Sequence, residues 1–283
     1  MIKVSAVVAL VVVACQPAAA PPLAPVPTRT PPVRIDPIAR GEYVATIAGC
    51  VLCHSRPGVH LAGGMEMQLP NGGVFRGPNI TSDRDTGIGA WSDQQVMSAI
   101  RLGMLPDGTQ LSSMMPYPSY HRMTDADAQA VVAFLRARPP IRNRVKRSEN
   151  LPMPAVAMPP AVGNVDPADD DGHGEYLVAL MHCAACHGND FAGGKQMGDV
   201  VAANITPDPT TGIGTWSEAD IARAVREMKT PDGHDILGPM AGYKGAWAIL
   251  TDRDAHAIAV FIKALAPVKS DRRRDQAEHV SSR

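Results

Sequence analysis

The sequence predicts an all-α protein of two tandem domains with long loops. Three observations point to this fold class: a block of about a hundred residues occurs twice, each copy opens and closes with helical spacing, and no stretch shows convincing strand alternation. The 25 Gly and 26 Pro among 283 residues favour short helices and long irregular segments over extended strands.

The composition excludes several classes of protein. An apolar fraction of 45% excludes a disordered chain, and an aromatic fraction of 4% speaks against one large aromatic core. The formal net charge is −1, from 27 basic and 28 acidic residues, so the general electrostatic case for a nucleic-acid-binding protein is absent.

The N-terminus has the pattern of an export signal. Lys3 precedes an apolar run from Val4 to Cys15, which is too short to span a bilayer and fits the apolar region of a signal peptide. The run ends in Val-Val-Ala-Cys-Gln, which resembles a bacterial lipoprotein box; residues 1–14 are thus predicted to be a lipoprotein-type signal peptide and Cys15 the lipidated residue. Ordinary cleavage after Ala20 is the alternative. We therefore expect an exported protein, lipid-anchored on the periplasmic side of a bacterial membrane.

Three further segments are predicted to lie outside the domains. Residues 15–37 are rich in Pro and form a tether that cannot bury a core. Residues 139–172 form a linker whose basic stretch 142–147 is interpreted as solvated charge. Residues 268–283 form a charged tail.

The repeat defines the two domains. Matching blocks recur at an offset of 133 up to the Cys-containing motif and at 125 to 127 after it. The matched pairs are Gly41–Tyr43 with Gly174–Tyr176, Cys50–His54 with Cys183–His187, Asn79–Thr81 with Asn204–Thr206, and Thr86–Ser92 with Thr211–Ser217. Two domains are therefore expected, at residues 38–138 and 173–267.

The opening helix of each domain is predicted from apolar spacing. Tyr43, Ile47 and Cys50 fall at i, i+4 and i+7, so one helix face leads to the first cysteine of the motif. Tyr176, Leu180 and Cys183 repeat this spacing in the second domain.

The middle and closing helices are predicted from their N-caps. The middle helix starts after Ser92, with Gln95 in the reciprocal position of a capping box, and after Ser217. The closing helix starts after Thr124 and after Thr251, each followed three residues later by an Asp.

The two Cys-x-x-Cys-His motifs carry the chemistry. This motif is the attachment signature of c-type haem, in which two thiols add to the porphyrin vinyl groups and the adjacent His ligates the iron. Residues three apart lie on one face of a helical turn, so both sulfurs can reach the same macrocycle. The sequence predicts two covalently bound haem c groups, on the residues Cys50, Cys53, His54, Cys183, Cys186 and His187.

Three other uses of the cysteines compete with this interpretation. A zinc site needs two such cysteine pairs about 15 to 20 residues apart, whereas Cys53 and Cys183 are separated by 130 positions. A thioredoxin-like pair needs a βαβ context, which the sequence lacks. Structural disulfides suit an exported protein but do not require a His after each pair.

The repeat also selects candidates for the second axial ligand. Met115 and Met240 are related by the offset of 125, whereas Met114 falls on Pro239, so Met115 and Met240 are the predicted iron ligands. Four histidines without a matched His are interpreted as packed or surface residues: His60, His121, His182 and His234.

Two tryptophans are candidate contacts to the haem groups. Trp91 and Trp216 each follow a Thr-Gly-Ile-Gly sequence, with one residue between. Each indole N–H is a potential donor to a haem propionate. Packing of the indole against the haem edge is the equal alternative.

Together these motifs resemble class I cytochromes c and, more narrowly, the cytochrome c subunits of bacterial membrane-bound alcohol and gluconate dehydrogenases. The resemblance covers about residues 40–137 and 173–266 and implies two tandem class I cytochrome c domains. It also implies that the first and last helices of each domain cross near a Gly and an aromatic residue, at Gly41 with Phe134 and Gly174 with Phe261. Met115 and Met240 match the axial methionines of that family, although those subunits usually have three haem domains and this chain has two.

The expected function is electron transfer rather than catalysis. A dihaem c-type cytochrome would pass electrons between a membrane-associated or periplasmic dehydrogenase and a downstream oxidase or cytochrome. The expected partners are these redox proteins and, through the lipid anchor, a membrane; nucleic acid is not among them. The alternative is a dihaem redox enzyme, a peroxidase or a sulfur-compound oxidoreductase, with one open haem.

Overall fold

The computed structural model describes residues 36–153, 158–160, 165 and 170–270. The predicted signal peptide, Cys15 with the alternative cleavage site at Ala20, and nearly all of the Pro-rich tether lie outside the described residues, as does the tail after residue 270.

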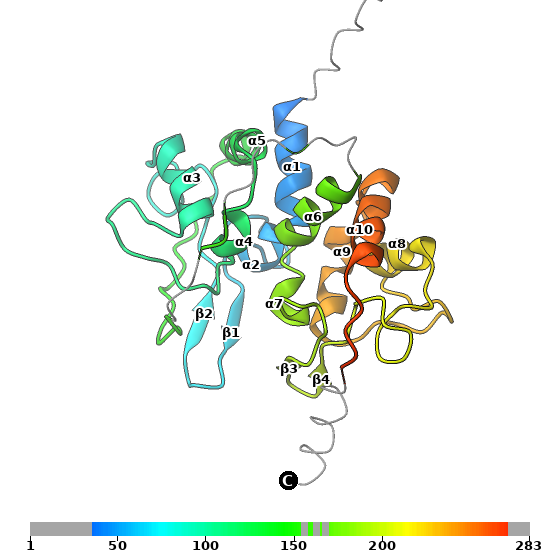
Figure 1. Cartoon of the computed structure of the whole chain (residues 1–283). Helices are drawn as coiled ribbons and strands as arrows, with labels where there is room; N and C mark the ends of the chain where they lie inside the picture. The colour runs from blue at the N-terminus through cyan, green and yellow to red at the C-terminus, as the bar shows by residue number, and fades with distance from the viewer. Residues whose placement is uncertain (1–35, 154–157, 161–164, 166–169, 271–283) are drawn as a thin grey trace, which may run out of the picture. The chain divides into compact units, whose positions relative to one another are not determined.

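Both repeats contain a similar succession of elements, with one additional 3₁₀ helix in the second (Figure 1). The elements of the first repeat are α1 (Pro37–Ile47), α2 (Cys50–His54), β1 (Glu66–Gln68), β2 (Val74–Arg76), α3 (Asp93–Leu102), α4 (Tyr117–Tyr120) and α5 (Asp125–Ala137). Those of the second are α6 (Asp170–Leu180), α7 (Ala184–His187), β3 (Gln196–Met197), β4 (Val200–Val201), α8 (Glu218–Glu227), the 3₁₀ helix η1 (Gly238–Tyr243), α9 (Lys244–Trp247) and α10 (Asp252–Ala264). The expectation of a mainly helical protein with long loops is confirmed.

Two details of the expected elements are wrong. Each repeat has a short antiparallel hairpin, β1 with β2 and β3 with β4, whereas the sequence predicted no strand. Strands of two or three residues are too short for apolar alternation to be visible. The opening helix also stops at Ile47 instead of running on to Cys50, because Gly49 has a left-handed backbone (φ 81°) and α2 begins anew after it.

The predicted helix starts are confirmed. Ser92 forms a full capping box with Gln95, and Ser217 forms one with Asp220. The hydroxyl of Thr124 accepts a hydrogen bond from the Asp127 backbone N–H at 3.2 Å, and Thr251 caps α10 in the same way.

The first and last helices of each repeat cross in close contact. A Cβ on Gly41 would lie 1.9 Å from the Ala130 carbonyl oxygen, and one on Gly174 would lie 2.1 Å from that of Ala257. These glycines therefore let α1 approach α5 and α6 approach α10 at backbone distance. Phe134 lies beside the first crossing and is fully buried, so the crossing inferred from the resemblance is confirmed there.

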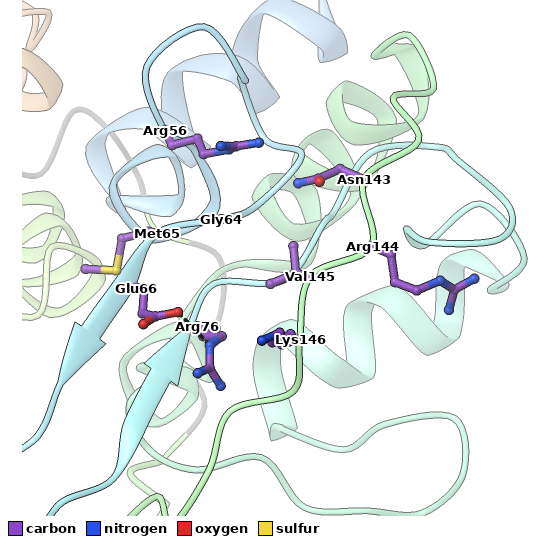
Figure 2. Close-up of a pocket in the computed structure, with 9 residues that line it drawn as sticks. All are labelled: Arg56, Gly64, Met65, Glu66, Arg76, Asn143, Arg144, Val145 and Lys146. Atoms are coloured by element: carbon purple, nitrogen blue, oxygen red, sulfur yellow. Dashed lines mark hydrogen bonds and ion pairs between the residues drawn. The ribbon is translucent and has the colours of Figure 1, made fainter.

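The first part of the predicted linker is bound to the first repeat. Asn143 donates from Nδ2 to the Ala62 carbonyl at 2.7 Å, and Val74 and Glu149 exchange two backbone hydrogen bonds. Figure 2 shows this run passing close to Arg76 at the end of β2. The side chain of Lys146 is nevertheless exposed, as expected for solvated charge.

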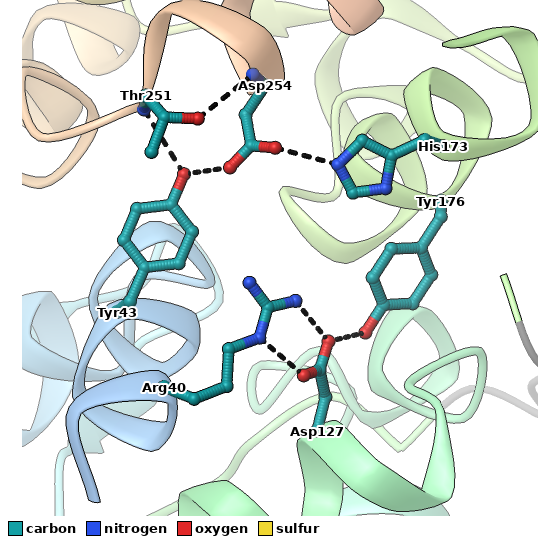
Figure 3. A network of polar contacts seen from close by, with 7 residues as sticks. All are labelled: Arg40, Tyr43, Asp127, His173, Tyr176, Thr251 and Asp254. Atoms are coloured by element: carbon teal, nitrogen blue, oxygen red, sulfur yellow. Dashed lines mark hydrogen bonds and ion pairs between the residues drawn. The ribbon is translucent and has the colours of Figure 1, made fainter. Parts of the chain in front are cut away.

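A reciprocal network joins the two repeats (Figure 3). The Asp127 carboxylate of α5 accepts hydrogen bonds from Arg40 at 2.7 and 2.8 Å, and a third from the Tyr176 hydroxyl at 2.6 Å. Asp254 of α10 pairs with His173 at 2.7 Å and accepts a hydrogen bond from the Tyr43 hydroxyl. Each Asp thus binds a basic residue of its own repeat and a Tyr of the other. The three residue types occupy matched positions: Arg40 with His173, Tyr43 with Tyr176, and Asp127 with Asp254.

This network should make the free energy of unfolding decrease at acid pH. Burial alone would raise the pKa of the Asp254 carboxyl, but the hydrogen bonds from His173 and Tyr43 outweigh burial and hold this pKa below its ordinary value. The stabilisation is present above the pKa of the unfolded chain and is lost as pH falls through the lower folded pKa, so the free energy of unfolding should decline below about pH 4. Asp254→Asn should cost about 1.5 to 3 kcal/mol at pH 7 and flatten that decline, measured by denaturant titration across pH.

Asp252→Asn is the matched control for this prediction, because Asp252 lies on the same helix with a side chain 97% exposed. It should change the free energy of unfolding by no more than about 0.5 kcal/mol. An acid decline in the Asp254 variant as steep as in the parent protein would contradict the role given to the network.

Candidate functional site

Each predicted histidine ligand is fixed by a backbone carbonyl; His54 is buried and His187 is half-buried. His54 is 6% exposed, and its Nδ1 lies 2.8 Å from the Pro78 carbonyl oxygen; Nδ1 of His187 lies 2.8 Å from that of Ala203. Burial lowers the pKa of both imidazoles and outweighs the opposing effect of the carbonyl, so both rings are neutral at pH 7. With Nδ1–H donating to the carbonyl, Nε2 keeps its lone pair, which is the arrangement of a metal-ligating histidine.

The four motif cysteines are half-buried and free. Burial raises the pKa of Cys50 and of Cys183 to about 12, so these side chains are thiols rather than thiolates. Thiol–disulfide exchange needs a thiolate, whereas attachment of haem adds an S–H across a vinyl double bond. Within the described part of the chain, no group of three or more His, Cys, Asp and Glu is suitable for a metal ion. This donor set fits covalent haem better than a zinc or redox-disulfide site.

The loop after each motif holds the carbonyl that binds the histidine. In the first repeat, Gly77 packs on the motif so closely that a Cβ would lie 1.7 Å from the Cys53 carbonyl oxygen. The next carbonyl, that of Pro78, then reaches His54. Asn79 fixes the following turn by accepting hydrogen bonds from the N–H and the hydroxyl of Thr81 at 2.9 and 2.8 Å. The second repeat uses Asn204 and Thr206 in the same way.

The two candidate methionines lie in partly equivalent surroundings. Met115 directly precedes the segment that leads into α4, and Met240 lies within η1; both are half-buried and pack against the main hydrophobic cluster. Met114 is also half-buried. The assignment of Met115 and Met240 to iron stays a prediction.

Trp91 and Trp216 are half-buried and pack against the same hydrophobic cluster. Their backbone carbonyls accept hydrogen bonds from Arg136 and from Lys263, the latter at 3.0 Å. Neither indole N–H has a hydrogen-bond partner among the described residues, so hydrogen bonding to a propionate and packing against the haem edge both remain open.

The residues just before the two motifs meet at one contact, which the sequence did not indicate. His182, directly before Cys183, shares a hydrogen bond of 2.8 Å between its Nε2 and the Tyr243 hydroxyl. A Cβ on Gly49, directly before Cys50, would lie 3.2 Å from Cε1 of the Tyr243 ring and 3.7 Å from Cε1 of His182. Gly49 and His182 occupy matched positions in the two repeats, so this contact brings the two motif-bearing segments together.

Aromatic packing supports the contact. The Tyr243 ring stacks on Trp247 with ring centroids 4.5 Å apart, and the Trp247 indole N–H donates to the Ile47 carbonyl of the other repeat at 3.0 Å. His182 is therefore packed and hydrogen-bonded at Nε2, whereas its Nδ1 is buried and has no hydrogen-bond partner among the described residues. Only the matched spacing of Gly49 and His182 could have signalled its place between the motifs.

A search of the described residues for helices able to cross a membrane found none with the necessary length and apolar character.

Comparison with known proteins gives consistent results. The family model described as cytochrome c matches residues 38–138 and 173–266. The chain is 34% identical over 266 residues to the cytochrome c subunit of the alcohol dehydrogenase (quinone) of Gluconacetobacter polyoxogenes, covering 82% of this chain and 56% of the relative. It is 31% identical over 262 residues to the fructose dehydrogenase cytochrome subunit of Gluconobacter japonicus, covering 83% and 53%. The chain thus spans little more than half the length of these two relatives.

A shorter relative matches over most of its length. The protein named diheme cytochrome c-type, of Cereibacter sphaeroides, is 30% identical over 262 residues, which are 82% of this chain and 86% of the relative.

Proposed function

Since the chain belongs to the cytochrome c family, we propose that it is a dihaem electron-transfer protein of two tandem class I domains, residues 38–138 and 173–267. The proposal depends most on one observation: in each of the two matched Cys-x-x-Cys-His motifs, Nδ1 of the His is bound to a backbone carbonyl, which leaves Nε2 available to ligate iron. Bound haem supplies an iron that changes reversibly between Fe(III) and Fe(II) by one electron.

In each domain, different side chains have separate roles in binding the haem. Two thiols would form the thioether links, the His Nε2 and a Met sulfur would ligate the iron, and the carbonyl partner of Nδ1 would fix the plane of the imidazole. The residues are Cys50, Cys53, His54 and Met115 in the first domain, and Cys183, Cys186, His187 and Met240 in the second. Trp91 and Trp216 would contact the two haem groups.

The contact among Gly49, His182 and Tyr243 supports transfer within the chain. It joins the segments that carry the two attachment sites, which favours transfer of an electron from one domain to the other. The reciprocal Asp127 and Asp254 network holds the domains in register at the same interface.

The proposed partners are a dehydrogenase as donor and a downstream oxidase or cytochrome as acceptor. The names of the relatives support this, since they are cytochrome subunits of fructose and alcohol dehydrogenases. We also propose a lipid on Cys15 and a periplasmic location. The lipid would hold this chain at the membrane, where it could meet both partners.

Two methionine variants separate electron transfer from redox catalysis at an open haem. If Met115 and Met240 both ligate iron, the reduced parent protein should bind carbon monoxide poorly and turn over little peroxide. Met115→Ala and Met240→Ala should each open one haem to carbon monoxide and lower its potential by an amount on the order of 0.1 V, within the roughly 0.8 V that axial ligands span. Absorption spectra and redox titration measure both effects.

Met114→Ala is the control, because the repeat offset does not match it to a methionine. Its spectrum and potentials should equal those of the parent protein. A high-spin haem or rapid peroxide turnover in the parent protein would instead support the enzyme, and an altered spectrum only in the Met114 variant would show that the ligand was wrongly assigned.

The anchor has a separate test. Cys15→Ser should release the protein from washed membranes into the soluble fraction, since a lipid on this cysteine is the proposed attachment. Fractionation followed by haem staining measures the distribution. A parent protein that is already soluble would favour cleavage after Ala20.

A further inference from the structure

A shallow basic hollow lies on the first repeat (Figure 2). Its walls come from the segment after His54, from both strands of the first hairpin and from the bound part of the linker. Its charged lining residues are Arg56, Glu66, Arg76, Arg144 and Lys146.

The basic hollow is built on the backbone that fixes the first attachment site. Arg56 follows His54 by two residues, and the Gly63 N–H donates to the His54 carbonyl at 2.7 Å. Gly64 donates to the Gly77 carbonyl at 3.0 Å, and Gly77 in turn packs on Cys53. One wall of the hollow is therefore continuous with the Cys-x-x-Cys-His segment.

The positive charge of the hollow is not neutralised within the described residues. Arg76 is paired with Glu66 at 2.7 Å and with Glu149 at 2.8 Å. Arg56, Arg144 and Lys146 are exposed and have no carboxylate partner in the part of the chain that the structure describes. Three solvated cations therefore surround an opening beside the attachment site.

The second repeat differs at the matched positions. Asn189 and Val201 replace Arg56 and Arg76, and the amine of Lys195 donates to the Ala185 carbonyl at 2.6 Å. At these two matched positions the second repeat therefore lacks the arginines that line the hollow of the first repeat.

The cations fit a protein face better than a small anion. A site built for a small anion would use buried donors, whereas Arg56, Arg144 and Lys146 are exposed around an open surface. Such an arrangement suits long-range steering and docking of an extended surface that is rich in carboxylates.

We propose that the basic hollow is the docking surface for the acidic face of a redox partner protein, and that electrons enter or leave the chain through the first repeat. The proposal rests on the electron-transfer function above. The partner's carboxylates pair with Arg56, Arg144 and Lys146, and docking there brings the partner beside the segment that carries Cys53 and His54.

Paired charge reversals test the surface on the full chain. Arg144→Glu with Lys146→Glu should weaken binding to immobilised poly-L-glutamate at low ionic strength by about tenfold. The control pair is Lys244→Glu with Lys269→Glu, two exposed lysines of the second repeat, which should change binding by less than about twofold. Equal losses in both pairs would overturn the docking surface.

Oxidation of the reduced protein by ferricyanide, a trivalent anion, tests the electron route. The reversal at Arg144 and Lys146 should slow the second-order rate by about tenfold at low ionic strength, and the difference should disappear in high salt. An unchanged rate would overturn entry or exit through the first repeat.

Two further measurements distinguish failure of the docking proposal from failure of the proposed electron-transfer function. If the reversal abolishes binding to phosphatidylglycerol vesicles but leaves poly-L-glutamate binding intact, the surface serves anionic lipid and the proposal is wrong. Haem staining on a denaturing gel is scored separately: absence of haem refutes the proposed function, whereas poly-L-glutamate binding still reports on the surface.

Discussion

Replacing Cys183 and Cys186 together by Ser should leave one covalently bound haem per chain where the parent protein has two. The serine hydroxyls cannot form the thioether links, and the second motif is separate in the chain from Cys50 and Cys53. Haem staining per mole of protein should fall by about half, and the mass of the denatured protein should fall by one haem, since covalent attachment alone survives denaturation.

The control for the attachment test is the remaining cysteine. Cys15→Ser changes a cysteine outside both motifs and should leave the haem content unchanged. Staining lost completely in the double variant would mean that the two sites do not mature independently, and unchanged staining would refute attachment at the second motif.

Local signals predicted most of the fold because capping is a short-range property. Ser92 with Gln95 and the hydroxyl of Thr251 each act on backbone groups within three residues, so sequence spacing was sufficient to place the starts of α3 and α10. The end of α1 was misplaced, because the break at Gly49 depends on one left-handed residue inside an otherwise helical apolar pattern. The hairpins were missed because their strands are two or three residues long.

The candidate site shows the same contrast between features set by local sequence and features set by tertiary packing. The motif predicted His54 as a ligand residue, and the structure fits that role, but the carbonyl that orients its ring belongs to Pro78, whose side chain carries no chemical signal. Tyr176 and Asp127 looked like an ordinary helix-face residue and a capping residue; their hydrogen bond crosses the repeat interface and depends on tertiary packing. Matched positions in a repeat can suggest such pairs, yet only the folded chain determines which partners meet.

Gly41→Ala should lower the free energy of unfolding by about 3 kcal/mol, because the new Cβ would lie 1.9 Å from the Ala130 carbonyl oxygen and backbone there cannot yield without separating α1 from α5. Guanidinium denaturation of the haem-loaded protein measures the loss. Gly245→Ala is the matched control: nothing lies within 4 Å of its Cβ, and Ala favours a helix, so stability should stay the same or rise by up to about 1 kcal/mol. Equal effects of the two variants would show that the close crossing of α1 and α5 does not determine stability.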